Sequence, residues 1–400
     1  MTYSEALSYL HGAGRFSSRA TLERIKSLMS RLGDPQKNLR FIHVAGTNGK
    51  GSTCAMLDSI LRAAGYRTGL FTSPYLTDFC ERIRLNGNDI SRGELVKCVQ
   101  AVRDAAQGDE NEFELVTAAA LVYYSRSICD IVVWETGLGG RLDATNVIDP
   151  PDCAVITSIS FDHMAQLGDT IAQIASEKCG IIKPGTGGVV ASEQENEAME
   201  VIERACANAG VNLLKTKPDP DLRLPLKGAH QRQNAAAAAG AVEVLRSRGF
   251  VVSEEDLRRG LETVSWPGRL ELVSEAPPVI LDAAHNRSGF DALIESMGEL
   301  FPGKSVTAVC GMLADKEYEY CIKALAKICR RFVAVAPPSP RALEPGKAAG
   351  IASAYCEAAA GGELKTAIET EVRNLPPDSV LLICGSIYLI GDARRYFPTQ

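Results

Sequence analysis

The sequence predicts an α/β protein with two domains, a larger one built on a parallel sheet and a smaller Rossmann-like one that follows it. Three observations support this prediction. Short apolar segments that suit buried strands alternate with helical patterns along almost the whole 400-residue chain. These strand segments are nearly continuously apolar, as expected for parallel sheets that are covered on both faces. A glycine-rich loop joins the first strand to a helix, which is the arrangement of a P-loop domain.

The expected elements follow one another in the order of a repeated strand–helix unit. The strands are expected at Phe41–Ala45, Thr68–Phe71, Asp130–Glu135, Cys153–Ser158, Gly188–Ala191, Val279–Asp282, Val306–Gly311, Phe332–Ala336 and Val380–Gly385. Helical patterns lie between them, including Arg92–Ala106, Glu114–Ser127, Asp169–Cys179 and Gln231–Arg248. The Pro- and Asp-rich stretch Lys215–Lys227 is expected to be a surface excursion.

The break at Trp266-Pro267-Gly268 is the expected domain boundary. It divides the chain into a P-loop domain over residues 1–266 and a second α/β domain over residues 267–400. The second part, about 130 residues, has a normal size for a domain.

Composition excludes several classes of protein. The chain is 46% hydrophobic and 23% charged, with a net charge of −6. A mildly acidic chain without basic runs argues against nucleic acid or an anionic membrane surface as the main partner. We expect no signal peptide and no membrane span. The twelve cysteines are scattered singly without a C-x-x-C pair, which predicts reduced thiols in a cytoplasmic protein rather than disulfides or a zinc site.

The loop Gly46–Thr53 has the composition of an anion-binding cradle. Its three glycines let backbone N–H groups turn toward a phosphate, and the N-terminus of the following helix adds its positive dipole end. Lys50 can reach the β- and γ-phosphates, and Ser52 or Thr53 can offer a hydroxyl to Mg²⁺.

This loop departs from the common pattern G-x-x-x-x-G-K-[ST] at two positions. Val44 stands where the first glycine is expected, and Gly51 is inserted directly after the lysine. A glycine-rich turn without a ligand is the alternative interpretation. A lysine between glycines at the end of a buried strand has little structural purpose, so we expect the loop to bind nucleotide phosphate.

Polar side chains follow three of the expected strands. Glu135 ends an apolar strand, Ser73 lies in a turn just beyond the second strand, and His163 follows the strand that ends near Ser158. Ligands of open α/β sheets bind beyond the carboxyl ends of the strands. Each residue alone could be structural, but a carboxylate, a hydroxyl and an imidazole around one phosphate site suit Mg²⁺ better than zinc.

Several later residues are weaker candidates. The position of Lys178 at the end of a helix predicts an ordinary solvated cation that complements the helix C-terminus. A polar segment that includes Asn234 opens a helix and could contact a nucleotide base. Arg269 at the expected hinge and Asp282 at a strand end could close over a nucleotide, or they could form ordinary salt bridges between domains.

Taken together and in this order, these segments resemble the folylpolyglutamate synthase/dihydrofolate synthase family of Mur-type ATP-dependent amide ligases. The resemblance covers nearly the whole chain. Its motifs are HVAGTNGKGST, TSPYLTDFCERIRLNG, FELVTAAAL, ETGLGGRLDATN, FDHMAQLGDTIAQIASEKCGIIKPG, HQRQNAAAA, WPGRLEL, LDAAHN, GMLADKEYEY and CGSIYLIGDARR. The family's own phosphate loop carries the extra glycine, which accounts for the departure at Gly51.

The resemblance implies roles for residues. Those expected to bind ATP are Thr47, Asn48, Gly49, Lys50, Gly51, Ser52, Thr53, Asn234, Arg269 and Asp282. Those expected to hold Mg²⁺, as two ions, are Ser52, Ser73, Glu135, His163 and a carbamylated Lys178. The expected catalytic residues are Lys50, Lys178, His163 and His285. Phe113, Asp143 and Ala144 match positions near the pterin pocket.

The chain departs from the family at a few positions. Ala283 and Arg287 replace residues common in the DxAHN region, and the segment Asp109–Glu112 is unusually acidic. The acidic segment leaves the use of dihydropteroate open.

The implied reaction joins L-glutamate to the carboxylate of a folate or of dihydropteroate through an acyl phosphate made from ATP. The expected protein is a cytoplasmic monomer that binds neither nucleic acid nor membrane. Three alternatives compete with this interpretation. A non-catalytic nucleotide-binding protein would have lost a metal ligand, and none is missing from the sequence. A Mur-type ligase for a cell-wall precursor shares the mechanism, but usually has Thr directly after the lysine and needs an additional domain. A P-loop GTPase would carry Asn-Lys-x-Asp, yet no asparagine in this chain precedes a lysine.

Overall fold

The computed structural model describes residues 1–14 and 21–397, and the chain divides into two compact units. The first unit runs to Pro225 and resumes over Arg232–Val264. The second contains the short segment Leu226–Gln231 and the chain from Ser265 onward. The sequence places a single break at Trp266–Gly268 and gives no sign that Leu226–Gln231 belongs with the later residues.

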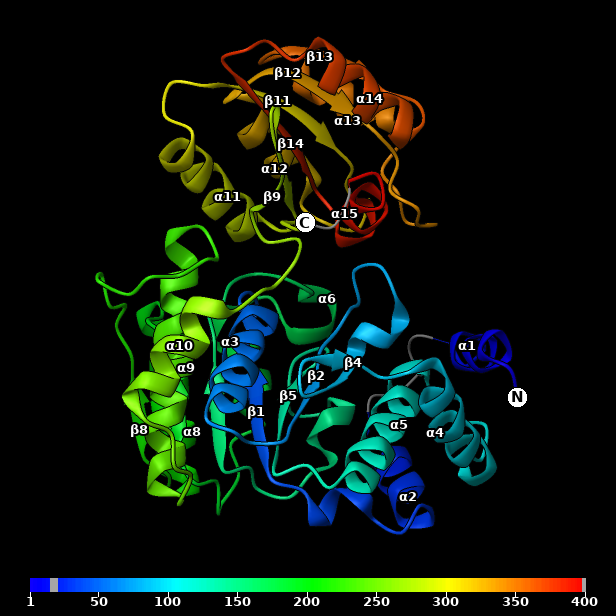
Figure 1. Ribbon diagram of the computed structural model, residues 1–400, viewed down its shortest axis with the longest axis vertical. Coiled ribbons are helices and arrows are strands. Elements are labelled where there is room, and N and C mark those ends of the chain that lie inside the picture. The colour runs from blue at the N-terminus through cyan, green and yellow to red at the C-terminus, as the bar shows by residue number, and fades with distance from the viewer. Residues whose placement is uncertain (15–20, 398–400) are drawn as a thin grey trace. The chain divides into compact units, whose positions relative to one another are not determined.

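The first unit is organised around a mostly parallel sheet with the strand order β4-β3-β2-β5-β1-β6-β7-β8 (Figure 1). Strands β2, β5, β1, β6, β7 and β8 are mutually parallel, whereas β3 and β4 form an antiparallel edge. In chain order the strands are β1 (Phe41–Ala45), β2 (Thr68–Phe71), β3 (Ile83–Leu85), β4 (Asn88–Asp89), β5 (Ile131–Glu135), β6 (Cys153–Ile156), β7 (Val189–Ala191) and β8 (Leu213–Lys215).

Two clusters of buried apolar residues attach helices of this unit to the sheet. One cluster joins α1, α2, α4 and α5 to the side chains of Phe71 and Trp134, and Figure 1 shows these four helices gathered together. The other joins α7 and α8 to β6 and β7. The helices are α1 (Tyr3–Gly12), α2 (Glu23–Arg31), α3 (Lys50–Ala63), α4 (Arg92–Ala105), α5 (Glu112–Ser127), α6 (Met164–Leu167), α7 (Ile171–Cys179), α8 (Asn196–Ala209), α9 (Ala229–Ser247) and α10 (Glu254–Thr263). Short 3₁₀ helices lie at Pro35–Asn38, Phe79–Arg82 and Ala144–Val147.

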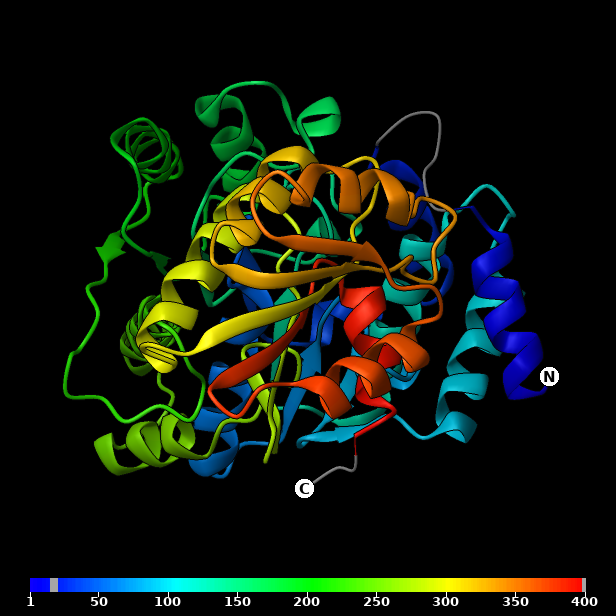
Figure 2. The same cartoon turned by 90° about the horizontal axis from the view of Figure 1, so that it is seen from above.

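The second unit is a sheet with the order β13-β12-β11-β14-β10-β9, in which β9 alone pairs antiparallel among the described strands. Helices α11, α12 and α13 share one apolar cluster with the sheet, while α14 and α15 pack against β10, β11 and β14. Figure 2 shows helices on both faces of this sheet. The elements are β9 (Glu271–Glu275), β10 (Pro278–Asp282), α11 (Arg287–Leu300), β11 (Ser305–Cys310), α12 (Tyr318–Ala326), β12 (Cys329–Ala334), α13 (Pro345–Ala352), β13 (Glu357–Ala360), α14 (Leu364–Asn374), β14 (Ser379–Cys384) and α15 (Ile387–Arg394).

The α/β architecture with parallel-dominated sheets is confirmed, and the differences lie at the sheet edges. Strands β1 and β2 have the expected bounds, and the other predicted strands begin or end within three residues of expectation. The short strands β3, β4, β8, β9 and β13 were not predicted, because each is short or has exposed positions and lacks a continuous apolar run. All twelve cysteines are free thiols, and all but Cys356 are buried. Among the described residues we find no helix long and apolar enough to cross a membrane.

Candidate active site

The phosphate loop connects β1 to α3 in a conformation that requires glycine. Gly49 caps α3 with φ +85°, in the left-handed region where side chains are strained. A Cβ at Gly49 would lie 2.2 Å from Oδ1 of Asn234, and one at Gly46 would lie 1.8 Å from Oγ1 of Thr157. The loop is therefore packed directly against α9 and against the end of β6. This packing brings Asn234, a residue distant in sequence, beside the loop.

Two lysine ammonium groups meet at one carbonyl oxygen of this loop. Lys50 donates from Nζ to the carbonyl oxygens of Gly46 and Thr47, both at 3.1 Å. Lys178 donates from Nζ to the same Gly46 oxygen at 2.7 Å. The ammonium group of Lys50 and the positive end of α3 make this a positive site, to which Lys178 adds charge in its protonated form. A polyphosphate is the type of ligand that such a site favours.

Lys178 is buried, and the prediction that it is an ordinary solvated cation is wrong. Its residue is 3% exposed, although it lies in the last turn of α7. Burial, followed by the charge of Lys50, lowers its pKa from 10.5 to about 7, against the opposing charges of Asp162 and Asp143.

The backbone around Lys178 explains why its side chain runs inward. A Cβ at Gly140 would lie 2.7 Å from the Lys178 carbonyl oxygen, and one at Gly180 would lie 2.3 Å from Cα of Arg141. The end of α7 therefore packs closely on the loop after β5, and the backbone N–H of Arg141 donates to Glu177 at 2.8 Å. This contact depends on residues far apart in the sequence.

Glu135 lies at the carboxyl end of β5, beside the phosphate loop. The register pairs it with Val44, directly before the end of β1. It is 4% exposed, and its Oε2 accepts from the backbone N–H of Ser73 at 2.9 Å. Since β2 and β5 are parallel neighbours, the turn that carries Ser73 and the end of β5 meet at the same sheet edge. The structure thus brings together Glu135 and Ser73, as the sequence predicts.

His163 lies in the loop after β6, with φ +51° and a side chain that is 42% exposed. Its Nε2 is 3.9 Å from Oδ1 of Asp162, and the same oxygen accepts from the His163 backbone N–H at 2.8 Å. Asp162 is more enclosed, with a side chain that is 11% exposed, and its charge acts on Lys178. Asp162 was not predicted as a site residue. Its position next to a candidate histidine after a strand end was the available signal.

Three residues expected near a substrate pocket lie around the loop that follows β5. The ring of Phe113 lies against Gly137, where a Cβ would approach it to 2.5 Å, and its centroid is 6.0 Å from that of Phe71. Asp143 accepts from the backbone N–H of Leu138 at 2.7 Å, which closes the loop, and burial raises the pKa of its carboxyl group. Ala144 follows in a buried turn.

Three acidic residues on either side of Phe113 pair with side chains of the N-terminal helices. Glu110, Glu112 and Glu114 are each at most 9% exposed. Glu110 pairs with Arg31 at 2.8 Å, Glu112 with His11 at 3.1 Å, and Glu114 with Arg24 at 3.1 Å. These pairs join α1 and α2 to the start of α5. The carboxylates are engaged in attaching these helices.

The second unit gathers its own polar groups at the end of β10. Asp282 accepts from the backbone N–H groups of Leu270 and Ala284 at 2.9 and 2.8 Å. Arg269 donates to the Gly268 carbonyl oxygen at 3.0 Å, and Nδ1 of His285 lies 3.0 Å from the carbonyl oxygen of Ala283.

His230 also belongs to this group and was not predicted as a site residue. Burial lowers its pKa; the nearby charge of Asp282 opposes this shift and that of Arg269 adds to it. Arg269, Asp282 and His230 are thus close enough to interact within the second unit.

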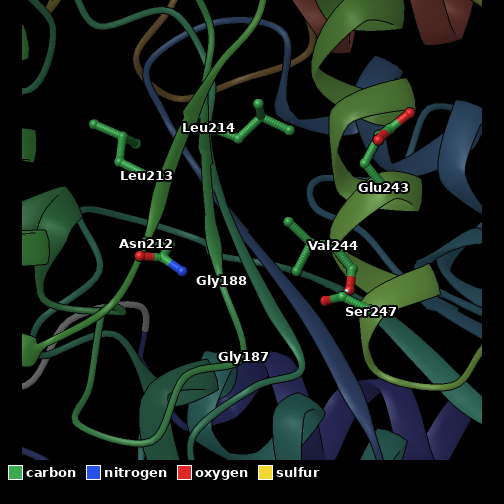
Figure 3. A pocket seen from close by; sticks show the side chains of 8 residues that line it. All are labelled: Gly187, Gly188, Asn212, Leu213, Leu214, Glu243, Val244 and Ser247. Carbon is green, nitrogen blue, oxygen red and sulfur yellow. Dashed lines mark hydrogen bonds between the residues drawn. The ribbon is translucent and has the colours of Figure 1, made fainter.

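A surface hollow of about 310 Å³ lies away from the phosphate loop (Figure 3). Figure 3 shows Val244 and Ser247 of α9 on one side and Leu213 and Leu214 of β8 on the other. Gly187 and Gly188 precede β7, so the hollow lies at the amino ends of the strands. Ligand sites of parallel sheets lie at the opposite ends, and we do not assign this hollow to the site.

Comparison with known proteins agrees with this geometry. The family described as the Mur ligase middle domain matches residues 44–221, and the Mur ligase glutamate ligase domain matches residues 268–387. A dihydrofolate synthase/folylpolyglutamate synthase from Bacillus subtilis is 40% identical, with 98% of each chain covered. The chain belongs to the dihydrofolate synthase/folylpolyglutamate synthase family.

Solved structures of the family share the whole fold. A Mycobacterium tuberculosis folylpolyglutamate synthase complexed with ADP has a TM-score of 0.90 and 31% identity, covering 100% of this chain and 98% of that chain. An Escherichia coli FolC in complex with DHPP and ADP has a TM-score of 0.91 and 30% identity, covering 99% and 97%. Members of the family are ATP-dependent ligases.

The side chains at the loop fit Mg²⁺, which ligases of this family use with ATP. Among residues 1–14 and 21–397, no group of three or more His, Cys, Asp or Glu side chains is arranged to hold a metal. A single carboxylate, Glu135, with hydroxyls of Ser52 and Ser73 suits a hard cation that takes most of its ligands from water and phosphate oxygens.

Proposed function

We propose that the protein is an ATP-dependent ligase that adds L-glutamate to a folate-type carboxylate, by polyglutamylation of tetrahydrofolate, by conversion of dihydropteroate to dihydrofolate, or by both. The observation that carries this proposal is the convergence of Lys50 and Lys178 on the Gly46 carbonyl oxygen, beside Glu135 at the neighbouring strand end. Family membership supplies the class of substrate. The curated relatives that cover nearly the whole chain carry folate-enzyme names, which disfavours a ligase for cell-wall precursors.

The phosphate loop has a defined task in this reaction. A substrate carboxylate attacks the γ-phosphorus of ATP, and ADP leaves. Lys50 and the first backbone N–H groups of α3 are then available to stabilise the added negative charge. The backbone N–H groups of Thr47 and Asn48 donate to the Ser158 carbonyl oxygen at 2.8 and 3.3 Å. We therefore assign phosphate contacts chiefly to Gly49, Lys50, Gly51, Ser52 and Thr53, with Asn234 beside them.

We assign Ser52, Ser73, Glu135 and His163 to the holding of Mg²⁺, together with Lys178 as its carbamate. Bound Mg²⁺ would neutralise phosphate charge and polarise the γ-phosphoryl group. A buried lysine with a pKa near 7 supports carbamate formation, because the neutral amine is the form that reacts with CO₂.

We assign the folate-type substrate to Phe113, Asp143 and Ala144. The second unit, with Arg269, Asp282 and His285, is assigned to glutamate binding and to closure over ATP. Closure would exclude water from the acyl phosphate before the glutamate amine attacks its carbonyl carbon and expels phosphate.

We also propose that the protein is a cytoplasmic monomer. Twelve free cysteines are typical of a reducing compartment. Light scattering coupled to gel filtration would test the state of assembly, and a mass of one 42.9 kDa chain is expected.

The test of function is ATP-, Mg²⁺- and glutamate-dependent phosphate release, with dihydropteroate and tetrahydrofolate offered separately. Lys50→Ala and Glu135→Ala serve as variants. Removing one preorganised electrostatic contact typically costs about 2.7–4 kcal/mol of barrier, so each should lose about a hundredfold or more in turnover. A folded variant that keeps more than about a tenth of turnover, a loss of about 1.4 kcal/mol, would rule out the assigned role.

A further inference from the structure

The phosphate loop is held by the segment Thr157–Ser160, which follows β6. The Ser158 carbonyl oxygen accepts from the backbone N–H groups of Thr47 and Asn48. Oγ1 of Thr47 donates to the Ser160 carbonyl oxygen at 3.0 Å and accepts from the Ser160 N–H at 3.1 Å. Oγ1 of Thr157 donates to the Asn48 carbonyl oxygen at 2.8 Å. The position of Thr47 and Asn48 therefore follows that of this segment.

The segment is in turn held by one side chain from the next loop, that of Gln194 beyond β7. Its Nε2 donates to the Thr157 carbonyl oxygen at 2.9 Å, and its Oε1 accepts from the Ile159 N–H at 3.0 Å. The amide thus bridges two backbone groups on either side of Ser158. This orientation pairs each donor with an acceptor, and the flipped amide would oppose both contacts. Gln194 itself is half-buried.

We propose that Gln194 is a positioning residue for nucleotide binding, acting through Thr157–Ser160 on the phosphate loop. The proposal rests on the proposed function in so far as the loop binds ATP. Gln194 bonds to the segment directly, while the segment provides the bonds to Thr47 and Asn48. A shift of the Ser158 carbonyl oxygen releases two backbone N–H groups at the start of the loop. The backbone conformation from Gly46 to Gly49, which requires glycine at both ends, is then no longer fixed.

The same segment leads into Asp162 and His163, so the effect should extend to the residues expected beside Lys178. The substrate loop after β5 is held separately, by Asp143 on Leu138. Loss of Gln194 should consequently weaken nucleotide binding without weakening the binding of the folate-type substrate. This difference separates a positioning role from general destabilisation.

The test compares Gln194→Met with Gln100→Met in the full-length protein. Methionine has similar length and removes both amide contacts. Gln100 lies on α4 and donates to Asp104 at 2.7 Å in an exposed contact, so its variant controls for loss of a surface glutamine bond. The Kd for Mg·ADP is measured by calorimetry, KM for ATP and for the folate-type substrate by phosphate release, and folding by chemical denaturation.

We expect Gln194→Met to weaken Mg·ADP binding and to raise KM for ATP by about tenfold, which corresponds to about 1.4 kcal/mol. KM for the folate-type substrate should change less than twofold, and Gln100→Met should match the wild type. Gln194→Glu keeps the acceptor for Ile159 but turns a second oxygen toward the Thr157 carbonyl. It should therefore be at least as defective as Gln194→Met.

A double-mutant cycle provides a further readout. Thr47→Val removes the hydroxyl that exchanges hydrogen bonds with Ser160. If Gln194 acts through this connection, the effects of Gln194→Met and Thr47→Val on Mg·ADP binding should be markedly less than additive.

Three results would overturn the proposal: an unchanged Kd in folded Gln194→Met, an equal loss for both substrates that follows a loss of stability, or full additivity with Thr47→Val. A wild-type protein that binds Mg·ADP but does not ligate glutamate would contradict the proposed function instead.

Discussion

Replacement of Lys178 tests the chemistry of the site, because the structure places this amine where its protonated form is disfavoured. Burial and the charge of Lys50 lower its pKa to about 7. At pH 7 about half of such amines are neutral, whereas an ordinary lysine with a pKa near 10.4 is neutral in only about one molecule in 2,500. The population able to react with CO₂ is therefore about a thousandfold larger.

Carbamate formation converts the amine into an oxygen anion of the kind that Mg²⁺ prefers. Lys178→Ala should then be nearly inactive, and acetate or formate should restore part of the rate by occupying the anionic position. Lys178→Arg should stay inactive with these additives, because it keeps a positive charge. If Lys178→Arg keeps most of the wild-type activity, the carbamate hypothesis is refuted.

Labelled bicarbonate allows the carbamate to be observed directly by ¹³C NMR. We expect a carbamate resonance that grows as the pH rises through about 7, because the amine loses its proton there. Lys183 is a suitable control, since it is another lysine whose pKa burial lowers, to about 8, and its Nζ donates to the Ile148 carbonyl oxygen at 2.6 Å. The resonance should persist in Lys183→Met and vanish in Lys178→Ala. The opposite pattern would show that Lys183, and not Lys178, carries the carbamate.

Three further predictions address other parts of the structure. Arg269→Ala should weaken ATP binding and slow turnover together if the second unit closes over ATP, and unchanged kinetics would make Arg269 a structural residue. Gly49→Ala should abolish nucleotide binding measured by calorimetry, whereas Gly65→Ala, at φ +88° with open space around its Cβ, should lose some stability but still bind. Arg24→Ala removes the cationic partner of the buried Glu114 carboxylate and should lower the free energy of unfolding by about 3 kcal/mol, measured in urea. Arg92→Ala, in an exposed pair, should change it little, and equal losses would contradict this reasoning.

The sequence was sufficient to predict those elements whose pattern lies within a few neighbouring residues. Short, largely apolar segments predicted β1 and β2, and the glycines around Lys50 predicted the loop and the start of α3. The core strands β10, β11 and β14 were found for the same reason. Edge strands such as β8 and β13 were missed, because their exposed positions remove the apolar pattern.

The features that were missed depend on contacts between distant segments. Gln194 has no distinguishing neighbours in the sequence. Lys178 was selected only through the family resemblance, because its position at a helix end indicates a solvated side chain until α7 packs on Gly140. The acidic residues around Phe113 can be understood only once α2 is seen to supply arginine partners for Glu110 and Glu114. The proximity of His230 to Asp282 likewise requires the fold.

The most direct test of the account follows the oxygen atoms of the substrate carboxylate. If the carboxylate attacks the γ-phosphorus and phosphate later leaves from the acyl carbon, that phosphate keeps one oxygen from the carboxylate. The experiment uses a folate-type substrate labelled with ¹⁸O at both oxygens of the reacting carboxylate, together with ATP, Mg²⁺ and glutamate. Mass spectrometry of the released phosphate should show one ¹⁸O for each amide formed. Unlabelled phosphate released alongside normal amide formation would contradict the acyl phosphate mechanism.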